Sequence, residues 1–201
     1  MATRTITRLY DTYDEAAKAV RALEAAGVPH DDISVVRSGH DEASGTGGET
    51  VADAGTGAGV GATLGTLVGG GAGLLAGIGA LAIPGVGPVV AAGWLVAALT
   101  GAGVGAAAGG LLGSLTGAGV SEEDAHVYAE GVRRGGTMLT ARVDEGQAAR
   151  VEAVLASGGH VDIAARRSEY QSEGWDRFDP AAPAYTASDV QAERKRRVRV
   201  S

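Results

Sequence analysis

Four histidines and one acidic run are the residues of this chain whose types could bind a metal or move a proton. The histidines share no spacing that suits a metal ion, and His30 beside Asp31 and Asp32 is typical of a solvated turn. The acidic run 122–124 follows Ser121, and acids are favoured there because a helix N-terminus carries positive partial charge. The histidines are His30, His40, His126 and His160.

Nucleotide and nucleophile motifs are absent or out of context. Gly103-x-Gly105-x-x-Ala108 resembles a loose dinucleotide fingerprint, but it follows no strand pattern and lies inside a regular glycine repeat. The chain has no cysteine, and it has no Gly-x-Ser-x-Gly motif or phosphate loop. We therefore predict that the protein is not an enzyme, with no cofactor, metal or identified small-molecule ligand. The net charge of −7 argues against nucleic-acid binding.

The dominant feature is the segment 54–120, which has no charged residue or histidine and holds 22 of the 34 glycines. Glycine recurs there every fourth residue in two runs, separated by the Pro-Gly segment 83–88, with Ala97 in the one gap of the second run. Glycine at this spacing removes side-chain bulk from one helix face, so that two helices can approach closely. We predict a glycine-zipper helical hairpin. Its helix-packing glycines are Gly57, Gly61, Gly65, Gly69, Gly73, Gly77, Gly93, Gly101, Gly105, Gly109, Gly113 and Gly117.

The surroundings of this hairpin are predicted to be lipid or other copies of the chain, because its apolar residues point in all directions. Each arm of about 30 residues exceeds the roughly 20 needed to cross a bilayer. The nearest flanking charges, including Asp53 and Glu122, are acidic, so the positive-inside signal is missing. We predict the bacterial inner membrane with a cytoplasmic domain. A soluble homo-oligomer in the cytoplasm is the alternative.

The flanking regions alternate between strand and helix patterns. Without the hairpin and the helix after it, their order is βαββαβ. We predict an α+β, ferredoxin-like sandwich formed by residues 1–37 and 121–167, with 38–53 as a flexible linker. The expected strands are 3–10, 33–37, 137–143 and 160–164, and the expected helices are 14–26, 146–157 and the one that starts after Ser121.

The last segment, 168–201, is predicted to be an extended tail. Trp175, Phe178 and Tyr185 are spaced among prolines in a chain poor in aromatics, which suits docking onto a groove of its own domain or of a neighbour. The basic end 194–199 is predicted to be solvated, with contact to anionic lipid or nucleic acid as the alternative.

The N-terminal residues resemble a known family. The run Leu9-Tyr-Asp-Thr-Tyr-Asp-Glu-Ala-Ala-Lys-Ala-Val-Arg-Ala-Leu-Glu-Ala-Ala-Gly-Val, followed by Asp32-Ile-Ser-Val-Val36, is similar to the general stress protein 17M-like (YflT-type) domain. That resemblance implies a bacterial stress-associated protein without catalytic residues to carry over. The hairpin departs from the short family domain.

Two functions remain open at this point. The first is a non-enzymatic stress-associated protein that self-assembles through its glycine hairpins at the membrane. The second is a soluble, homo-oligomeric binding or regulatory module that uses the ferredoxin-like sheet.

Overall fold

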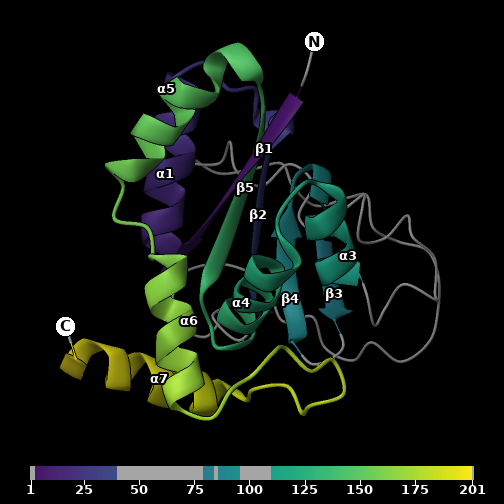
Figure 1. Ribbon diagram of the computed structural model, residues 1–201, viewed down its shortest axis with the longest axis vertical. Coiled ribbons are helices and arrows are strands. Elements are labelled where there is room, and N and C mark those ends of the chain that lie inside the picture. Colours follow the sequence, from purple (N-terminus) through teal and green to yellow (C-terminus); the bar gives the residue numbers. More distant parts are fainter. Residues whose placement is uncertain (1–2, 40–78, 84–85, 96–109, 201) are drawn as a thin grey trace, which may run out of the picture.

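The computed structural model describes residues 3–39, 79–83, 86–95 and 110–200, and shows an α+β fold built on one antiparallel sheet (Figure 1). Five strands in the order β1-β5-β2-β4-β3 form this sheet. The strands are β1 (Thr3–Tyr10), β2 (Ile33–Ser38), β3 (Gly79–Ile83), β4 (Gly87–Ala92) and β5 (Thr137–Asp144).

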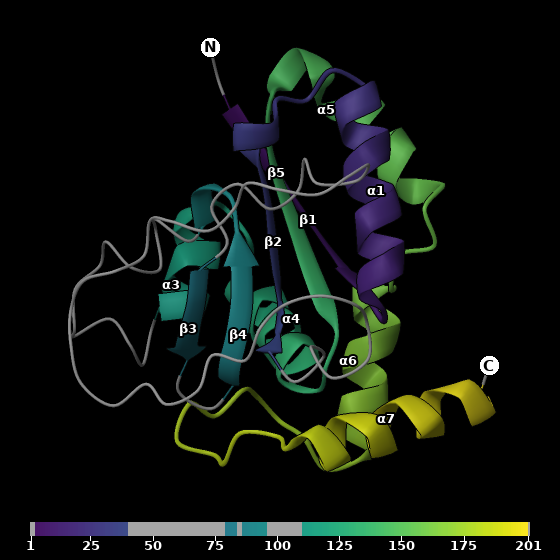
Figure 2. The same cartoon turned by 180° about the vertical axis from the view of Figure 1, so that it is seen from behind.

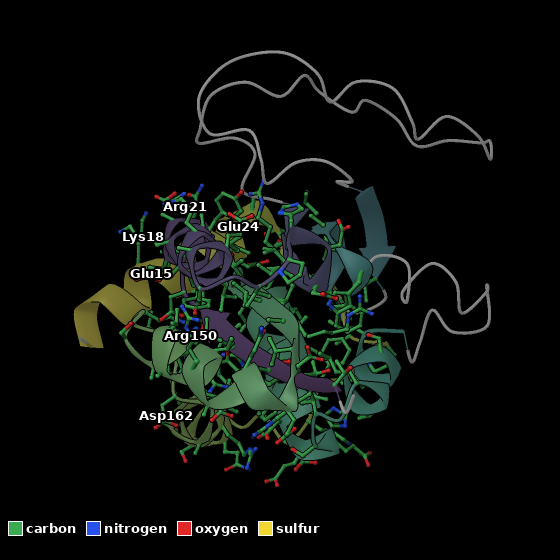
Figure 3. All side chains as sticks on the ribbon, turned by 90° about the horizontal axis from the view of Figure 1, so that it is seen from above. Glu15, Lys18, Arg21, Glu24, Arg150 and Asp162 are labelled. Atoms are coloured by element: carbon green, nitrogen blue, oxygen red, sulfur yellow. The ribbon has the colours of Figure 1, made fainter. Side chains whose placement is uncertain are left out.

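The first unit, β1-α1-β2, forms where the sequence predicts it. Helix α1 (Tyr13–Ala25) begins with a capping box in which Thr12 Oγ1 accepts from the Glu15 amide, and Glu15 accepts from the Thr12 amide. Gly27, with φ +90°, lies just beyond its end. The outer side of α1 carries Glu15, Lys18 and other charged residues, so this side is solvated (Figure 3).

Strand β5 lies between β1 and β2, as the middle strand of a split βαβ arrangement. It pairs antiparallel with both, Met138 opposite Leu9 and Thr137 opposite Arg37. Helix α5 (Glu145–Ala156) then packs beside α1 on one face of the sheet (Figure 2). The predicted strands at 3–10, 33–37 and 137–143 and the helix at 146–157 are thus confirmed.

The fourth predicted strand, 160–164, is wrong. The Val161 amide donates one 2.8 Å hydrogen bond to the Leu9 carbonyl at the outer edge of β1, as the strand would have done. Asp162 then caps a helix instead, because its Oδ1 accepts from the amides of Ala164 and Ala165 at 2.8 and 3.0 Å. The chain turns into α6 (Ile163–Ser172) after this single contact.

The predicted helical hairpin is wrong between residues 79 and 92, where β3 and β4 form an antiparallel β-hairpin. Strand β4 pairs with β2, placing Ala91 opposite Val36, and so covers backbone groups that would otherwise form an open edge. Helix α3 (Gly110–Gly117) agrees with the helical prediction. The remainder of the hairpin, with Gly57, Gly61, Gly65, Gly69, Gly73, Gly77, Gly101, Gly105 and Gly109, and most of the predicted linker lie outside the described residues.

The sheet has helices on both faces, which a two-layer ferredoxin-like sandwich would not have. Helices α1 and α5 cover one face, with Val20, Leu23 and Leu155 buried in that core. On the other face, α4 (Glu122–Arg133) and α3 bury Tyr128 and Leu115 against Leu9 and Val36. The third layer therefore comes from the segment that leads into β5.

The tail is not extended along its whole length, as predicted, but contains two helices. Besides α6, helix α7 (Ala187–Val200) lies across the lower end of the molecule (Figure 1). Its start is fixed by Thr186, whose amide donates to Asp189 Oδ2 at 2.9 Å and whose Oγ1 accepts from the Asp189 amide at 3.3 Å. Residues 175–186 between the helices have no regular structure.

Candidate functional site

Helix α3 presents a face of small residues away from the protein core. Its Leu111 and Leu115 are buried, whereas Gly113, Thr116 and Gly117 are exposed. A Cβ atom added to Gly113 or Gly117 would meet no heavy atom within 4 Å in the described part of the chain. We call Gly113, Thr116 and Gly117 the open face of α3. These two of the twelve predicted packing glycines therefore stand four residues apart on a helix surface that no described residue covers.

Gly93 is not a helix-packing glycine, contrary to the prediction. It follows β4 with φ +92°, a left-handed conformation that favours glycine. A Cβ atom there would lie 2.1 Å from the Ile33 carbonyl oxygen and 2.8 Å from Ser34 Cα. The glycine is required because the chain turns sharply against the backbone of β2.

The three aromatic residues of the tail lie against the chain's own domain. Phe178 is buried and joins the core cluster that contains Val89 and Leu115. Trp175 packs edge-on against Tyr170 of α6, with ring centroids 5.6 Å apart. The Tyr185 ring lies beneath the Arg133 guanidinium at 4.7 Å. Of the two docking surfaces considered from the sequence, the structure places these side chains on their own domain.

A buried network of ion pairs holds α7 to α4 and α6. Arg134 donates to Glu130 at 2.7 Å and to Glu193 of α7 at 3.4 Å, and it also pairs with Glu173. Glu130 and Glu193 are only 1% and 2% exposed. Burial lowers the pKa of Arg134, but the hydrogen bonds to Glu130 and Glu173 outweigh burial and raise that pKa above its ordinary value. Arg134 therefore stays charged, and loss of one partner in the network would leave a buried charge unpaired.

The basic end predicted from the sequence belongs in part to this network. Arg196 pairs with Glu173 and Glu193, and Arg197 pairs with Glu193 and Asp11. Arg194 donates to the Gly135 carbonyl at 2.9 Å. Arg196 and Arg197 therefore pair with the protein's own acids, which leaves less free positive charge for lipid or nucleic acid than the sequence indicates.

The histidines and acids considered for chemistry are dispersed. His30 Nδ1 lies 2.9 Å from Glu24 Oε1, and His160 Nδ1 lies 3.1 Å from the Leu155 carbonyl. Glu123 and Asp124 pair with Arg167 of α6. In residues 3–39, 79–83, 86–95 and 110–200, no group of three or more histidines and acids is placed to hold a metal ion.

Among the helices that the structure describes, none combines the length and the apolar character needed to cross a bilayer.

Several features of this region were not predicted from the sequence, although the sequence contains a recognisable signal for some of them. Asp162 before Ile163, and Thr186 three residues before Asp189, are both helix-start patterns. The β3–β4 hairpin left no clear signal, because helical and strand spacing cannot be distinguished in a short run of glycine, alanine and valine. The sequence also contains no signal for the burial of Glu130 and Glu193, because charged residues on helices are usually solvated.

Comparison with known protein families gives a match over the N-terminal part of the chain. Residues 5–75 match the family described as the heat induced stress protein YflT domain. No curated protein and no solved structure matches the chain. The described part of the matched segment is β1-α1-β2, and β5, which lies between β1 and β2, falls after it in the sequence. The chain thus carries, over residues 5–75, a YflT domain of the heat-induced stress protein type.

Proposed function

We propose that this protein is a non-enzymatic, stress-associated protein that self-assembles through glycine-mediated helix packing. The observation that carries the proposal is the open face of α3, where two glycines stand four residues apart with no described atom near them. The sequence extends the same spacing toward the N-terminus through Gly101, Gly105 and Gly109. A second copy of the same surface is the partner that this spacing suits.

The energetics of α3 support a partner outside the protomer. Each glycine in a helix interior costs about 1 kcal/mol relative to alanine. Gly113 and Gly117 occupy two positions of an eight-residue helix and gain no close contact among the described residues. Close packing against another helix would offset this cost, because the two backbones then come close enough for dispersion contacts and weak Cα–H···O hydrogen bonds.

The position of α3 also favours assembly. Leu111 and Leu115 anchor its opposite side in the core shared with α4, so the open face is held on a rigid support. A rigid, preformed surface loses little conformational entropy on association.

The experiment is a double substitution, Gly113→Leu with Gly117→Leu, compared with wild type by light scattering coupled to size-exclusion chromatography. Both positions are open, so the fold should persist while the added side chains hold a second helix away. Gly146→Leu is the matched control, because Gly146 in α5 is also open. We expect an assembled wild type and control, and a smaller mass for the double variant. A monomeric wild type, or an unchanged mass in the double variant, contradicts the proposal.

A location at the inner membrane, through residues 54–78, is part of the same proposal, because residues 79–92 lie in the sheet and Leu111 and Leu115 lie in the core. It rests on the uncharged composition and length of that segment. Carbonate washing of membranes from cells that express the full chain tests it, because carbonate releases peripheral proteins and leaves integral ones. Complete release into the carbonate supernatant contradicts the membrane location. Whether the protein assembles in solution is then decided by the light-scattering mass measurement alone.

A further inference from the structure

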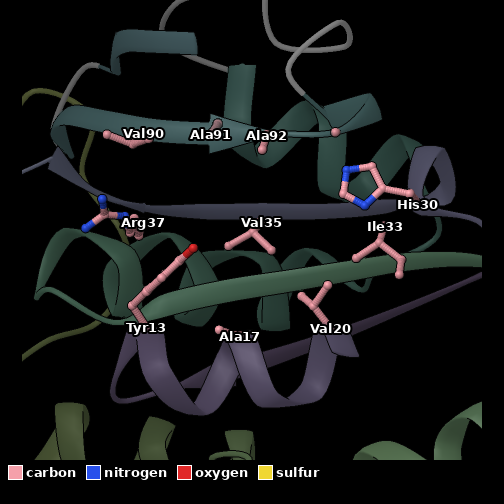
Figure 4. Close-up of a pocket in the computed structure, with 11 residues that line it drawn as sticks. Tyr13, Ala17, Val20, His30, Ile33, Val35, Arg37, Val90, Ala91 and Ala92 are labelled. Atoms are coloured by element: carbon pink, nitrogen blue, oxygen red, sulfur yellow. The ribbon is translucent and has the colours of Figure 1, made fainter. Parts of the chain in front are cut away.

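A pocket lies beside α1, on the face of the sheet opposite α3 and α4 (Figure 4). The pocket itself has a volume of about 50 Å³, and about 570 Å³ of empty space, open solvent included, lies in and in front of it. One wall is α1, with Ala17 and Val20, and the floor is formed by β2 and β4. Val35 faces Ala92 across the β2–β4 pair, at the centre of the floor.

The pocket exists because the sheet is wider than the helices on this face. Helices α1 and α5 bury side chains of β1, β5 and the start of β2. The sheet continues through β4, whose Val90 and Ala92 stay half-buried on this side while Val89 and Ala91 are buried on the other. Among the described residues, no helix covers Val90 and Ala92, so the floor is an apolar surface next to a helix wall.

One end of the pocket carries a positive charge that no acid of the described residues neutralises. Arg37 lies opposite Val90 in the β2–β4 pair, and its guanidinium carbon is 4.9 Å from the centroid of the Tyr13 ring. In the described part of the chain, Arg37 forms no ion pair, whereas Arg134, Arg142 and Arg166 all do. Figure 4 shows the Tyr13 hydroxyl pointing toward β2 between Arg37 and Val35.

The other end of the pocket is lined by His30, whose Nδ1 lies 2.9 Å from Glu24 Oε1. The pocket thus combines an apolar floor with a single fixed cation and a phenolic hydroxyl at one end. Such a distribution suits a ligand that is apolar along its length and anionic at one terminus.

We propose that this pocket binds a small amphiphile with a carboxylate head group and an unbranched apolar tail. The carboxylate pairs with the Arg37 guanidinium and accepts from the Tyr13 hydroxyl, and the tail lies on Val35, Val90 and Ala92. The flat guanidinium offers two parallel N–H donors, which match the two oxygens of a carboxylate. This site is separate from the proposed assembly surface, which is on the other face of the sheet.

The test uses isothermal titration calorimetry of the full chain with decanoate and, in parallel, with decanol, both below their aggregation limits. Decanol has the same tail without the charge. We expect wild type to bind both, decanoate more tightly. Arg37→Gln should weaken decanoate binding about tenfold and leave decanol binding unchanged, because only the head group loses its partner. Arg21→Gln, on the outer side of α1, should behave as wild type.

A second variant locates the tail. Ala92→Leu fills the floor of the pocket and should weaken both ligands, and amide chemical-shift changes on adding decanoate should centre on Val35, Val90 and Ala92. The proposal is overturned if wild type does not bind decanoate, if Arg37→Gln binds it as tightly as wild type, or if the shift changes centre elsewhere. Gly113→Leu with Gly117→Leu should bind decanoate normally, so failure of assembly and failure of this site are distinguishable.

Discussion

Arg166 of α6 donates two parallel hydrogen bonds of 2.9 Å to Asp11, one to each carboxylate oxygen. Asp11 lies in the turn between β1 and α1. Arg166 is 8% exposed, and Arg197 of α7 donates a further 2.7 Å hydrogen bond to Asp11 Oδ1. A single carboxylate therefore ties both tail helices to the N-terminal unit.

Replacing this carboxylate should destabilise the protein. Asp11→Asn removes the charge partner of a buried guanidinium, and we expect the free energy of unfolding to fall by about 2 kcal/mol. Urea denaturation followed by circular dichroism measures the change. Asp176→Asn, at an exposed position of the tail, is the control and should change stability by less than about 0.5 kcal/mol. Equal stability of the two variants would show that the Asp11 contacts contribute nothing.

The same contact predicts a pH dependence. Burial raises the pKa of Asp11, but the hydrogen bond from Arg166 and the charge of Arg197 outweigh burial and hold the pKa below its ordinary value of 3.8. The stabilisation is therefore present above about pH 4 and is lost as the pH falls through the depressed pKa. The stability gap between wild type and Asp11→Asn should be widest near neutral pH and shrink in acid. A gap that grows in acid would reverse the sign.

Two buried tyrosines should respond differently to loss of their hydroxyl groups. The Tyr128 hydroxyl donates a 2.8 Å hydrogen bond to the Thr7 carbonyl, whereas the Tyr10 hydroxyl is buried without a hydrogen-bond partner among the described residues. We expect Tyr128→Phe to cost about 1 kcal/mol and Tyr10→Phe to be close to neutral. Denaturation at pH 7 measures both, and equal losses would contradict the assignment.

Alkaline pH should also unfold the protein through these residues. Burial raises the pKa of Tyr10 and of Tyr128 to about 12. The unfolded chain releases these protons near pH 10, so stability should fall between pH 10 and 12. The slope in that range should be shallower in Tyr10→Phe than in wild type. An identical slope would show that Tyr10 does not titrate with unfolding.

Alanine substitutions at two glycines with positive φ distinguish the cost of backbone strain from the cost of steric overlap. Gly27→Ala meets open space and should cost about 1 kcal/mol from the left-handed conformation alone. Gly93→Ala places its Cβ 2.1 Å from the Ile33 carbonyl oxygen, so the cost should exceed about 3 kcal/mol. Thermal unfolding of the two variants compares them directly. Similar losses would mean that the turn at Gly93 moves away from β2 at little cost.

The buried aromatic residue of the tail should hold the tail against the core. Phe178 is 3% exposed, and Phe178→Ala should lower the free energy of unfolding by about 3 kcal/mol. Limited proteolysis should cut between α6 and α7 faster in this variant than in Arg177→Ala, whose side chain is exposed. Equal cleavage rates would show that Phe178 does not anchor the segment.

The sequence predicts the local elements of this protein better than their pairing. The helices predicted over 14–26 and after Ser121 form, because hydrogen bonds confined to a few residues set their starts, at Thr12 with Glu15 in the first and at Ser121 in the second. Whether residues 79–92 form strands or a helix depends on pairing with the edge of β2, which lies far away in the chain. Val161 had a strand position available, but the side chain of the next residue, Asp162, starts a helix.

The same difference between local and long-range contacts decides which site residues can be predicted. The spacing of Gly113 and Gly117 identifies a small-residue face from sequence alone, since both lie on one helix. Gly93 shares that spacing but serves a turn, because its role depends on the backbone of Ile33. The pocket beside α1 arises from the width of the sheet relative to its helices, a property that exists only once the strands are assembled.

The position of β5 has a consequence for how the protein is made. This central strand joins β1 to β2, yet its Thr137 pairs with Arg37 across a long stretch of chain. During translation, β1 and β2 leave the ribosome well before β5. Strand β2 can pair with β4 earlier, whereas β1 pairs only with β5 among the described strands and has no partner until then. The N-terminal residues must therefore wait, exposed to chaperones and proteases, until the chain has been synthesised past Asp144.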